Sequence, residues 1–279
     1  MVSIITDSTA DLNKELIQRY GIQVVPLWVH FKDQTFQDGI DIDRNTLFSL
    51  VAESGELPKT AAVSVAEFWD VFNTNEESVY IGISSKLSSS VPNAILTSKE
   101  LLPEHRAHIV DSLNLSTGIG LLAIKAAELR EQGYSGEEIA QTINGLIPKI
   151  HTSFMIDTME YLYMGGRCSA MQNLVGSLLK IRPVISVRPD GTLGVKDKIR
   201  GSRKKALESM LLDFRNQLPN VDTQRVFITH TGCDDDATFL AEELQKITPI
   251  EEICITYAGC VISSHCGPNT IGILFISKE

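Results

Sequence analysis

The sequence predicts an α/β protein with two domains. The chain has 279 residues, of which 43% are hydrophobic, and this is enough to build a sizeable core. Up to about residue 150, short apolar runs alternate with segments of helical periodicity, a rhythm typical of β-α-β units. Beyond that point the pattern changes to a hairpin and to strands that alternate with two helices, so we expect a domain boundary there.

In the first part, buried apolar runs predict strands and helix-period runs predict helices. The expected strands cover residues 2–6, 22–31, 78–83 and 107–111, and the expected helices cover 12–20, 44–53, 65–72, 91–102, 114–132 and 139–150. The segment 114–132 is apolar on more than one face, so we expect it to lie deep against the sheet. A turn signal at 132–136 separates it from the next helix, which starts with Glu137-Glu138.

The second part predicts a sheet with helices on one face. Its expected strands cover residues 151–156, 183–187, 193–199, 225–230, 252–257 and 270–277, and its expected helices cover 158–163, 168–179, 203–217 and 234–246. The turn Arg188-Pro189-Asp190-Gly191-Thr192 joins two of these strands into a hairpin. The polar stretch Ser263–Thr270 is expected to form a bend between apolar runs, with its side chains facing a partner or ligand.

Composition and charge exclude several classes of protein. The formal net charge is −10, which disfavours nucleic acid or an anionic membrane as a general partner. No apolar run approaches the roughly 18–20 residues that span a bilayer, so we expect no stable membrane insertion. The chain begins with a strand-like run after Met1 rather than with a secretion signal, and we therefore expect a cytoplasmic protein.

The cysteines and one basic segment are the local exceptions to this ordinary composition. The five cysteines are odd in number and lack Cys-x-x-Cys spacing, so we expect reduced, mostly buried thiols and no metal site. Between Lys180 and Lys205, basic residues greatly outnumber Asp190 and Asp197. This segment is either a solvated surface or a face on which a partner docks.

Hydroxyl-rich clusters recur where apolar runs end. They occur at 6–11, 59–64, 84–90, 111–112, 165–167 and 263–270. In open α/β sheets the carboxyl ends of the strands form the ligand crevice, so these clusters are expected to meet there. Serine and threonine side chains suit recognition of an oxygen acid.

Three of these clusters carry residues with more than one possible role. Ser88-Ser89-Ser90 precedes Val91-Pro92, so one serine caps a helix whose free N–H groups would also favour an anion. Arg167 follows two glycines and would bind either a carboxylate or phosphate, or a structural Asp. His265 would donate to a carboxylate, act as a base toward a serine, or be a satisfied core histidine.

The same clusters, in the same order, resemble the DegV family of bacterial fatty-acid-binding proteins. The matching motifs are Thr6-Asp7-Ser8-Thr9-Ala10-Asp11-Leu12, Ile83-Ser84-Ser85-Lys86-Leu87-Ser88, Asp111-Ser112, Met164-Gly165-Gly166-Arg167 and Ser264-His265-Cys266-Gly267-Pro268-Asn269-Thr270. Together they span nearly the whole chain. No motif is decisive alone, but their common register makes a chance resemblance improbable.

The resemblance implies a fold and a site. The fold is an N-terminal three-layer α/β/α domain over 1–150 with a mainly parallel sheet, a C-terminal two-layer α+β domain over 151–279, and a ligand tunnel between them. The implied carboxylate ligands are Thr60, Ser88 and His265. The implied supporting residues of the head-group pocket are Arg167, Asp7, Ser8, Ser112, Ser264 and Gly267.

The resemblance also implies a function without catalysis. The protein would hold a long-chain fatty acid, with no other cofactor and no metal, and present its carboxylate to a separate ATP-dependent fatty acid kinase that makes acyl phosphate for phospholipid synthesis. The sequence departs from the family pattern at Ala61-Ala62-Val63, at Ser89-Ser90, and at Cys266 and Asn269. These departures concern chain-length preference and head-group geometry.

Two other functions compete with this one. A serine-dependent hydrolase would use Ser88 or Ser264 with His265 and Asp7, but the chain has no Gly-x-Ser-x-Gly elbow. A domain that binds a phosphate ligand or serves as a kinase substrate is the other alternative. The chain lacks the Gly-x-x-x-x-Gly-Lys-[Ser/Thr] loop that cradles nucleotide phosphates, so nucleotide binding is not expected.

Overall fold

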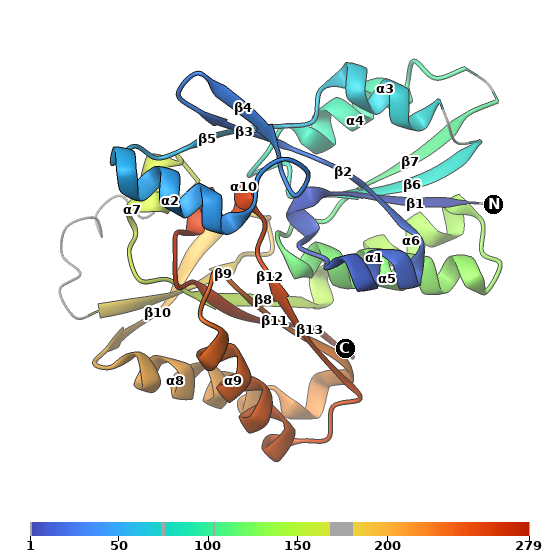
Figure 1. Cartoon of the computed structure of the whole chain (residues 1–279). Coiled ribbons are helices and arrows are strands. Elements are labelled where there is room, and N and C mark those ends of the chain that lie inside the picture. Colours follow the sequence, from blue (N-terminus) through green and yellow to red (C-terminus); the bar gives the residue numbers. More distant parts are fainter. Residues whose placement is uncertain (1, 74–75, 103, 168–180, 279) are drawn as a thin grey trace.

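The first sheet is parallel and built from the N-terminal part of the chain, as predicted. The computed structural model describes residues 2–73, 76–102, 104–167 and 181–278 (Figure 1). Four parallel strands follow the order β2-β1-β6-β7. Their bounds are β1 Ser3–Asp7, β2 Ile22–Val25, β6 Glu77–Gly82 and β7 Arg106–Asp111.

Helices cover both faces of this sheet, so the N-terminal domain has three layers (Figure 1). On one face lie α1 (Lys14–Tyr20), α5 (Thr117–Glu131) and α6 (Gly136–Leu146), and on the other lie α3 (Val65–Phe72) and α4 (Ser90–Ser98). Successive side chains of a strand point to opposite faces, so alternate residues pack in the hydrophobic cores on the two faces of the sheet. Ile4 packs with α5, whereas Ile5 packs with Phe68 and Phe72 of α3.

Helix α5 is buried on nearly all sides, as its sequence predicted. It packs on the parallel sheet and also contacts the C-terminal strands, so it lies between the two sheets. The helix starts at Thr117 rather than at residue 114, because Leu113 and Ser116 have φ values of 47° and 55° and cannot belong to a right-handed helix. These turns place Leu115 outside the helix.

A small antiparallel sheet was not predicted. The predicted strand 22–31 is two strands, β2 and β3 (Trp28–Phe31), separated around Pro26, which has no N–H for a ladder. Strand β3 pairs with β4 (Gln34–Gln37) and β5 (Lys59–Ala61). Both partners are short and polar, so their pattern did not indicate strands. Helix α2 (Arg44–Ser54) lies between them in the sequence and contributes Leu47 to the core beneath.

The C-terminal part forms a six-stranded mixed sheet in the order β10-β9-β8-β13-β11-β12. The strands are β8 Ile150–Met155, β9 Ile181–Val187, β10 Leu193–Arg200, β11 Val221–His230, β12 Glu252–Tyr257 and β13 Ile271–Ser277. Helices α8 (Arg203–Asn216) and α9 (Asp234–Ile247) cover one face, as predicted (Figure 1). The other face packs on the N-terminal domain, where Phe154, Phe227 and Leu274 join the core around α5. Short 3-10 turns occupy Ser8–Ala10, Ile147–Lys149 and Leu218–Asn220.

The stretch Ser263–Thr270 is helical in its first half and turns in its second, so the predicted bend is present only from Gly267 on. Helix α10 runs from Cys260 to Cys266, and the chain turns only at Gly267. Asp38 accepts hydrogen bonds from the N–H groups of Cys260 and Val261 at 2.7 and 3.3 Å, and so satisfies the first turn of the helix. This capping group lies far upstream in the chain, so local sequence did not reveal it. The predicted helix 168–179 lies outside the described residues, whereas α7 (Glu160–Met164) forms near its predicted place.

The two domains are also joined by an ionic cluster at the far end of α5. Arg225 of β11 contacts Glu128 of α5 at 3.2 Å, Glu252 of β12 at 2.7 Å and the Tyr20 hydroxyl at 2.7 Å. Arg19 of α1 contacts the same Glu252 at 2.7 Å. Because Arg225 is largely buried and paired on both sides of the interface, this cluster fixes the domains relative to each other.

Candidate ligand cavity

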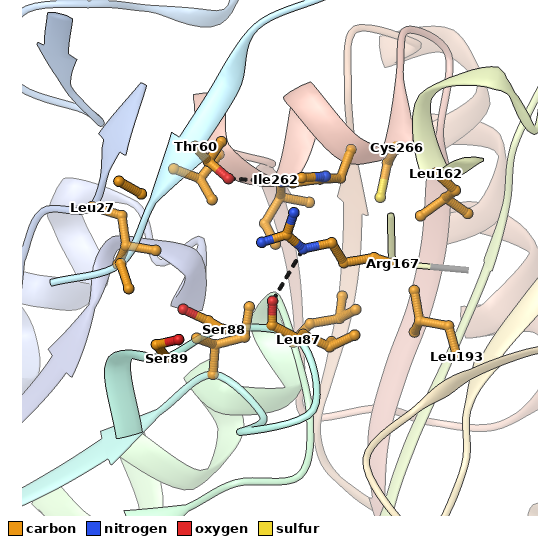
Figure 2. A pocket seen from close by; sticks show the side chains of 16 residues that line it. Leu27, Thr60, Leu87, Ser88, Ser89, Leu162, Arg167, Leu193, Ile262 and Cys266 are labelled. Atoms are coloured by element: carbon orange, nitrogen blue, oxygen red, sulfur yellow. Dashed lines mark hydrogen bonds between the residues drawn. The ribbon is translucent and has the colours of Figure 1, made fainter. Parts of the chain in front are cut away.

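A cavity of about 200 Å³ lies between the two domains (Figure 2). The N-terminal domain contributes residues from β5 and from the loop before α4, and the C-terminal part contributes residues from α7, β10 and α10. Its lining residues are Leu27, Thr60, Ala61, Ala62, Ile83, Leu87, Ser88, Ser89, Leu115, Leu162, Arg167, Leu193, Val261, Ile262, His265 and Cys266. Most of this surface is apolar, and the polar groups are few and specific.

Thr60 and His265 meet at the cavity wall. The Thr60 Oγ1 and His265 Nε2 atoms are 2.8 Å apart, although 205 residues separate them in the sequence. Thr60 lies on β5, whose pairing with Val29 of β3 fixes its direction, and His265 lies in the last turn of α10. Burial, together with the nearby Arg167 charge, lowers the pKa of His265 to about 4. The imidazole is therefore neutral at physiological pH.

The other ring nitrogen of His265 is enclosed without a partner in the described structure. It lies against Gly165, where an added Cβ would come within 2.2 Å of Nδ1, so only glycine fits at this position. A buried N–H without an acceptor is costly, and a bare lone pair costs less. The favoured tautomer thus carries its proton on Nε2 and donates to Thr60 Oγ1. The Thr60 hydroxyl hydrogen is then free to donate into the cavity.

Arg167 crosses the cavity between Thr60 and Ser88 (Figure 2). Its Nε donates to the Leu87 carbonyl at 3.1 Å and its Nη1 donates to the Gly165 carbonyl at 2.6 Å. Within residues 2–73, 76–102, 104–167 and 181–278, it has no carboxylate partner. Burial lowers the pKa of Arg167, yet the guanidinium remains charged. The cavity therefore contains an uncompensated positive charge.

Ser88 faces the cavity from the loop before α4. Its Oγ lies 3.0 Å from the Ser90 Oγ and accepts the Ser90 N–H at 3.2 Å. Ser89 occupies the N-cap position but its side chain makes no capping bond, so it also remains available at the cavity wall. The Ser84 hydroxyl binds the Gly191 carbonyl in the β9-β10 turn at 2.9 Å and ties this loop to the C-terminal domain.

Five of the predicted pocket residues do not line the cavity. Asp7 is fully buried, and its carboxylate accepts from the Tyr80 hydroxyl at 2.7 Å and from the Ile83 N–H at 3.1 Å. Burial raises the pKa of Asp7. These bonds hold the ends of β1 and β6 together behind the cavity. Asp7 thus supports the serine loop from within the core.

The remaining four have similar internal partners. Ser8 Oγ accepts the Leu27 N–H at 3.1 Å, and Ser112 Oγ donates to the Asn114 carbonyl at 3.3 Å. The Ser264 hydroxyl donates back to Cys260 within α10 at 2.7 Å. Gly267 has a φ of +77° and packs against Tyr161, where a side chain would clash. Each positions a loop or helix that carries a lining residue.

The prediction from sequence missed most of the apolar lining. Leu27, Leu115, Leu162, Leu193 and Ile262 come from separate elements, and each looks like an ordinary core residue in its local pattern. Two apolar lining residues could have been found from the sequence, because Ile262 lies close to the His265 motif and Leu87 lies next to Ser88. Ser89 was considered as a possible helix cap and Cys266 as a buried thiol, but neither was predicted to line the site.

The geometry gives little support to a hydrolase. The described structure has no hydrogen bond between Ser88 and His265, because His265 Nε2 binds Thr60 and Ser88 binds Ser90. No carboxylate orients the other His265 nitrogen in the described part of the chain. A neutral imidazole with a pKa of about 4 is also a weak base. The arrangement fits binding better than nucleophilic catalysis.

The fold and the site define a two-domain α/β protein whose domains enclose a largely apolar ligand cavity that contains one arginine. A family model described as "Uncharacterised protein, DegV family" matches residues 1–278, so the chain belongs to the DegV family. A DegV domain-containing protein from Caldanaerobacter subterraneus is 32% identical over 281 residues, which cover 99% of each chain. The family resemblance seen in the sequence is thereby confirmed.

Solved structures show the same fold. A DegV family protein from Thermus thermophilus, described for its fatty acid binding, is 32% identical with a TM-score of 0.92 and covers 99% of each chain. DegV of Bacillus subtilis, described as a fatty acid binding protein, is 27% identical with a TM-score of 0.87 and the same coverage. The fatty acid kinase B3 protein of Streptococcus pneumoniae, loaded with linoleic acid, shares the fold at 24% identity and a TM-score of 0.88, again over 99% of each chain.

The described residues contain neither a membrane-spanning helix nor a cluster of metal ligands. No helix there is long and apolar enough to cross a membrane. Likewise, no cluster of three or more His, Cys, Asp or Glu side chains in that part of the chain is arranged to hold a metal ion.

Proposed function

We propose that this protein binds a long-chain fatty acid in the cavity between its domains and presents the carboxylate to a separate fatty acid kinase. The observation that carries the binding proposal is the Arg167 guanidinium, which projects into a largely apolar cavity, donates to two carbonyls and has no carboxylate partner among the described residues. Burying a charge without a counter-ion costs on the order of several kcal/mol of desolvation free energy, and an anionic ligand offsets that cost. A ligand that is both anionic and apolar satisfies the whole lining. Fatty-acid-binding relatives of the same family support this choice.

The head group fits between Thr60 and Ser88. The Thr60 hydroxyl has a free hydrogen because His265 donates to its oxygen, and Ser88 lies across the cavity from it (Figure 2). A carboxylate there would accept from both hydroxyls and face Arg167. Hydrogen bonds to charged groups contribute about 1.5–3 kcal/mol each. The remaining affinity would come from the tail, at roughly 0.8 kcal/mol per buried CH₂.

Native mass spectrometry of the purified protein tests this proposal. We expect a non-covalent adduct with the mass of a fatty acid, which is lost after delipidation and restored by palmitate or oleate. Arg167→Gln and Thr60→Val should lower the adduct fraction at limiting ligand. A protein that is free of lipid as purified and binds neither acid after delipidation would refute the proposal.

An ester assay separates this function from hydrolysis. The binding proposal predicts no turnover of p-nitrophenyl palmitate above the rate of heat-denatured protein. Turnover that is robust and disappears in Ser88→Ala would instead favour the hydrolase. Testing Ser209→Ala beside it controls for a nonspecific effect of serine removal, because Ser209 lies on α8, away from this cavity.

The kinase partner is the finer part of the proposal and follows from the family resemblance. Of the basic segment, Arg203 contacts Asp157, Asp236 and the Asn269 carbonyl, so it is held inside the fold. Arg200 and Lys204 are exposed and have no acidic partner among the described residues. They are the better candidates for docking an acidic kinase surface.

Charge reversal of this pair tests the docking face. The double variant Arg200→Glu/Lys204→Glu should retain fatty acid binding but slow acyl phosphate formation by a DegV-associated fatty acid kinase at least tenfold. The control Lys14→Glu/Lys99→Glu makes the same change in net charge at exposed sites elsewhere. Equal kinase rates for the two double variants would reject docking at this face.

A further inference from the structure

Two aspartates of the N-terminal domain hold the start of α10, a helix of the C-terminal part of the chain. Asp38 accepts hydrogen bonds from the N–H groups of Cys260 and Val261, at 2.7 and 3.3 Å. Asp11 accepts from the preceding N–H group, that of Gly259, at 2.8 Å. Both aspartates are buried. Three successive N–H groups at the start of α10 are therefore satisfied from the other domain.

Each aspartate is itself fixed by a second contact. The Asp38 N–H donates to the Leu27 carbonyl at 2.9 Å, and Leu27 lines the ligand cavity. The other carboxylate oxygen of Asp11 accepts from the Ser116 hydroxyl at 2.5 Å, next to the start of α5. Helix α10 forms a further part of the cavity wall. Asp38 thus connects two walls of the cavity, the one at Leu27 and the one that α10 forms.

The opposite end of α10 carries His265, whose Nε2 atom lies 2.8 Å from Thr60 Oγ1. The helix has only seven residues, so its position depends on the contacts that hold it rather than on its own stability. Successive helical residues are about 1.5 Å apart along the axis, and a hydrogen bond is lost beyond about 3.5 Å. A slip of α10 by one residue would therefore break the bond between His265 and Thr60.

We propose that Asp38, supported by Asp11, is a positioning residue for recognition of the fatty acid carboxylate. In the described structure neither aspartate lines the cavity, so both act through the helix that they hold. They keep α10 at the height at which His265 donates to Thr60, and so leave the Thr60 hydroxyl hydrogen directed to the ligand. This inference rests on the binding function proposed above.

A double-mutant cycle on delipidated protein tests this role through the affinity for palmitate. Asp38→Ala should lower the affinity roughly tenfold, because it misplaces the hydrogen bond on which the Thr60 hydroxyl depends. In a Thr60→Val background, which lacks this hydroxyl, the same substitution should lower the affinity less than about twofold. Such non-additivity is expected of residues that act through one contact, whereas independent effects multiply.

Two further variants complete the cycle. Asp38→Asn retains one acceptor oxygen for α10, so it should recover part of the affinity, and it keeps the test valid if Asp38→Ala does not fold. Ser135→Ala is the control, because it removes the side-chain cap of α6, a helix that does not line the cavity. The control should change the affinity less than about twofold in both backgrounds.

Proton NMR of the ligand-free protein gives a readout that a general loss of stability would not move. The Nε2 proton of His265 is hydrogen-bonded to Thr60, so it should exchange slowly and give a signal that is missing in His265→Gln. Asp38→Ala should shift or broaden this signal. Ser135→Ala should leave it unchanged.

Two negative results have different meanings. If the wild-type protein binds no fatty acid, the proposed function fails and the role of Asp38 in recognition fails with it. The second result is a wild type that binds fatty acid while Asp38→Ala lowers the affinity by the same factor with and without the Thr60 hydroxyl, or leaves the His265 signal unchanged. Asp38 would then stabilise α10 without positioning His265, so this inference would be refuted and the proposed function would stand.

Discussion

Replacing Thr60 by valine removes one hydroxyl with almost no change of shape. In the structure this hydroxyl accepts from His265 Nε2 at 2.8 Å, which leaves its own hydrogen free for the ligand carboxylate. The substitution deletes one hydrogen bond to a charged group, which contributes about 1.5–3 kcal/mol. The dissociation constant should therefore rise by roughly 10- to 150-fold.

Displacement of a fluorescent polyene fatty acid by palmitate, on delipidated protein, measures this change. Thr35→Val is a matched control, because Thr35 Oγ1 also binds a histidine ring, His30 Nδ1, at 2.9 Å, but on the exposed side of the small sheet. We expect the control to bind within about twofold of wild type. Equal affinities for Thr60→Val and Thr35→Val would show that the Thr60 hydroxyl does not hold the carboxylate.

The remaining predictions concern the titration of His265, the cap of α10 and the charge of Arg167. Because the pKa of His265 is lowered to about 4, its ring should stay neutral in ligand-free protein down to that pH, and an NMR titration midpoint near 6.5 would contradict this. The unfolded imidazole protonates first as pH falls, so His265 should lower stability progressively from about pH 6.5 to about pH 4, and His265→Gln should lose that part of the pH dependence. Asp38→Ala should destabilise the protein by ~1–3 kcal/mol in urea unfolding, because it leaves two N–H groups of α10 without a partner. The exposed helix cap Asp43→Ala should cost only about 1 kcal/mol, and equal losses would argue against a special role for Asp38. Arg167→Gln should lower palmitate affinity at least tenfold yet change the ligand-free melting temperature by only a few degrees, since the charge has no acidic partner among the described residues; a large loss of ligand-free stability would mean that Arg167 is chiefly structural.

The sequence predicted the parallel sheet and the place of the polar loops that follow its strands. Ser84–Ser90 and Asp111-Ser112 do follow neighbouring strands and meet at one edge, where Ser84 N–H donates to the Asn114 carbonyl at 2.8 Å. The β-α-β rhythm is a local pattern, and it fixes which strand ends share an edge. Local periodicity was therefore sufficient for this part of the fold.

Elements stabilised by distant partners were not predictable in the same way. Strand β5, which carries Thr60, is only three residues long and exists through pairing with β3. Helix α10, which carries His265, depends on Asp38 from the other domain. The sequence singled out Thr60 and His265 through the family resemblance, but their hydrogen bond needs both of these nonlocal contacts. The apolar wall was missed for the same reason, since no local pattern separates a cavity-lining leucine from a core leucine.

The ionic cluster of Arg225 bears on how a lipid could enter. Glu128 lies 11 residues beyond Thr117 on α5, about 16 Å from the end of the helix that faces the cavity. A rotation of one domain about this cluster would barely move the charged groups, but would open the opposite end by several times as much. The cluster thus lies at one end of the domain interface, and the cavity lies at the other. Opening the cavity in this way would break the hydrogen bonds that Thr60, Ser84 and Arg167 make across it, while the ion pairs stay intact.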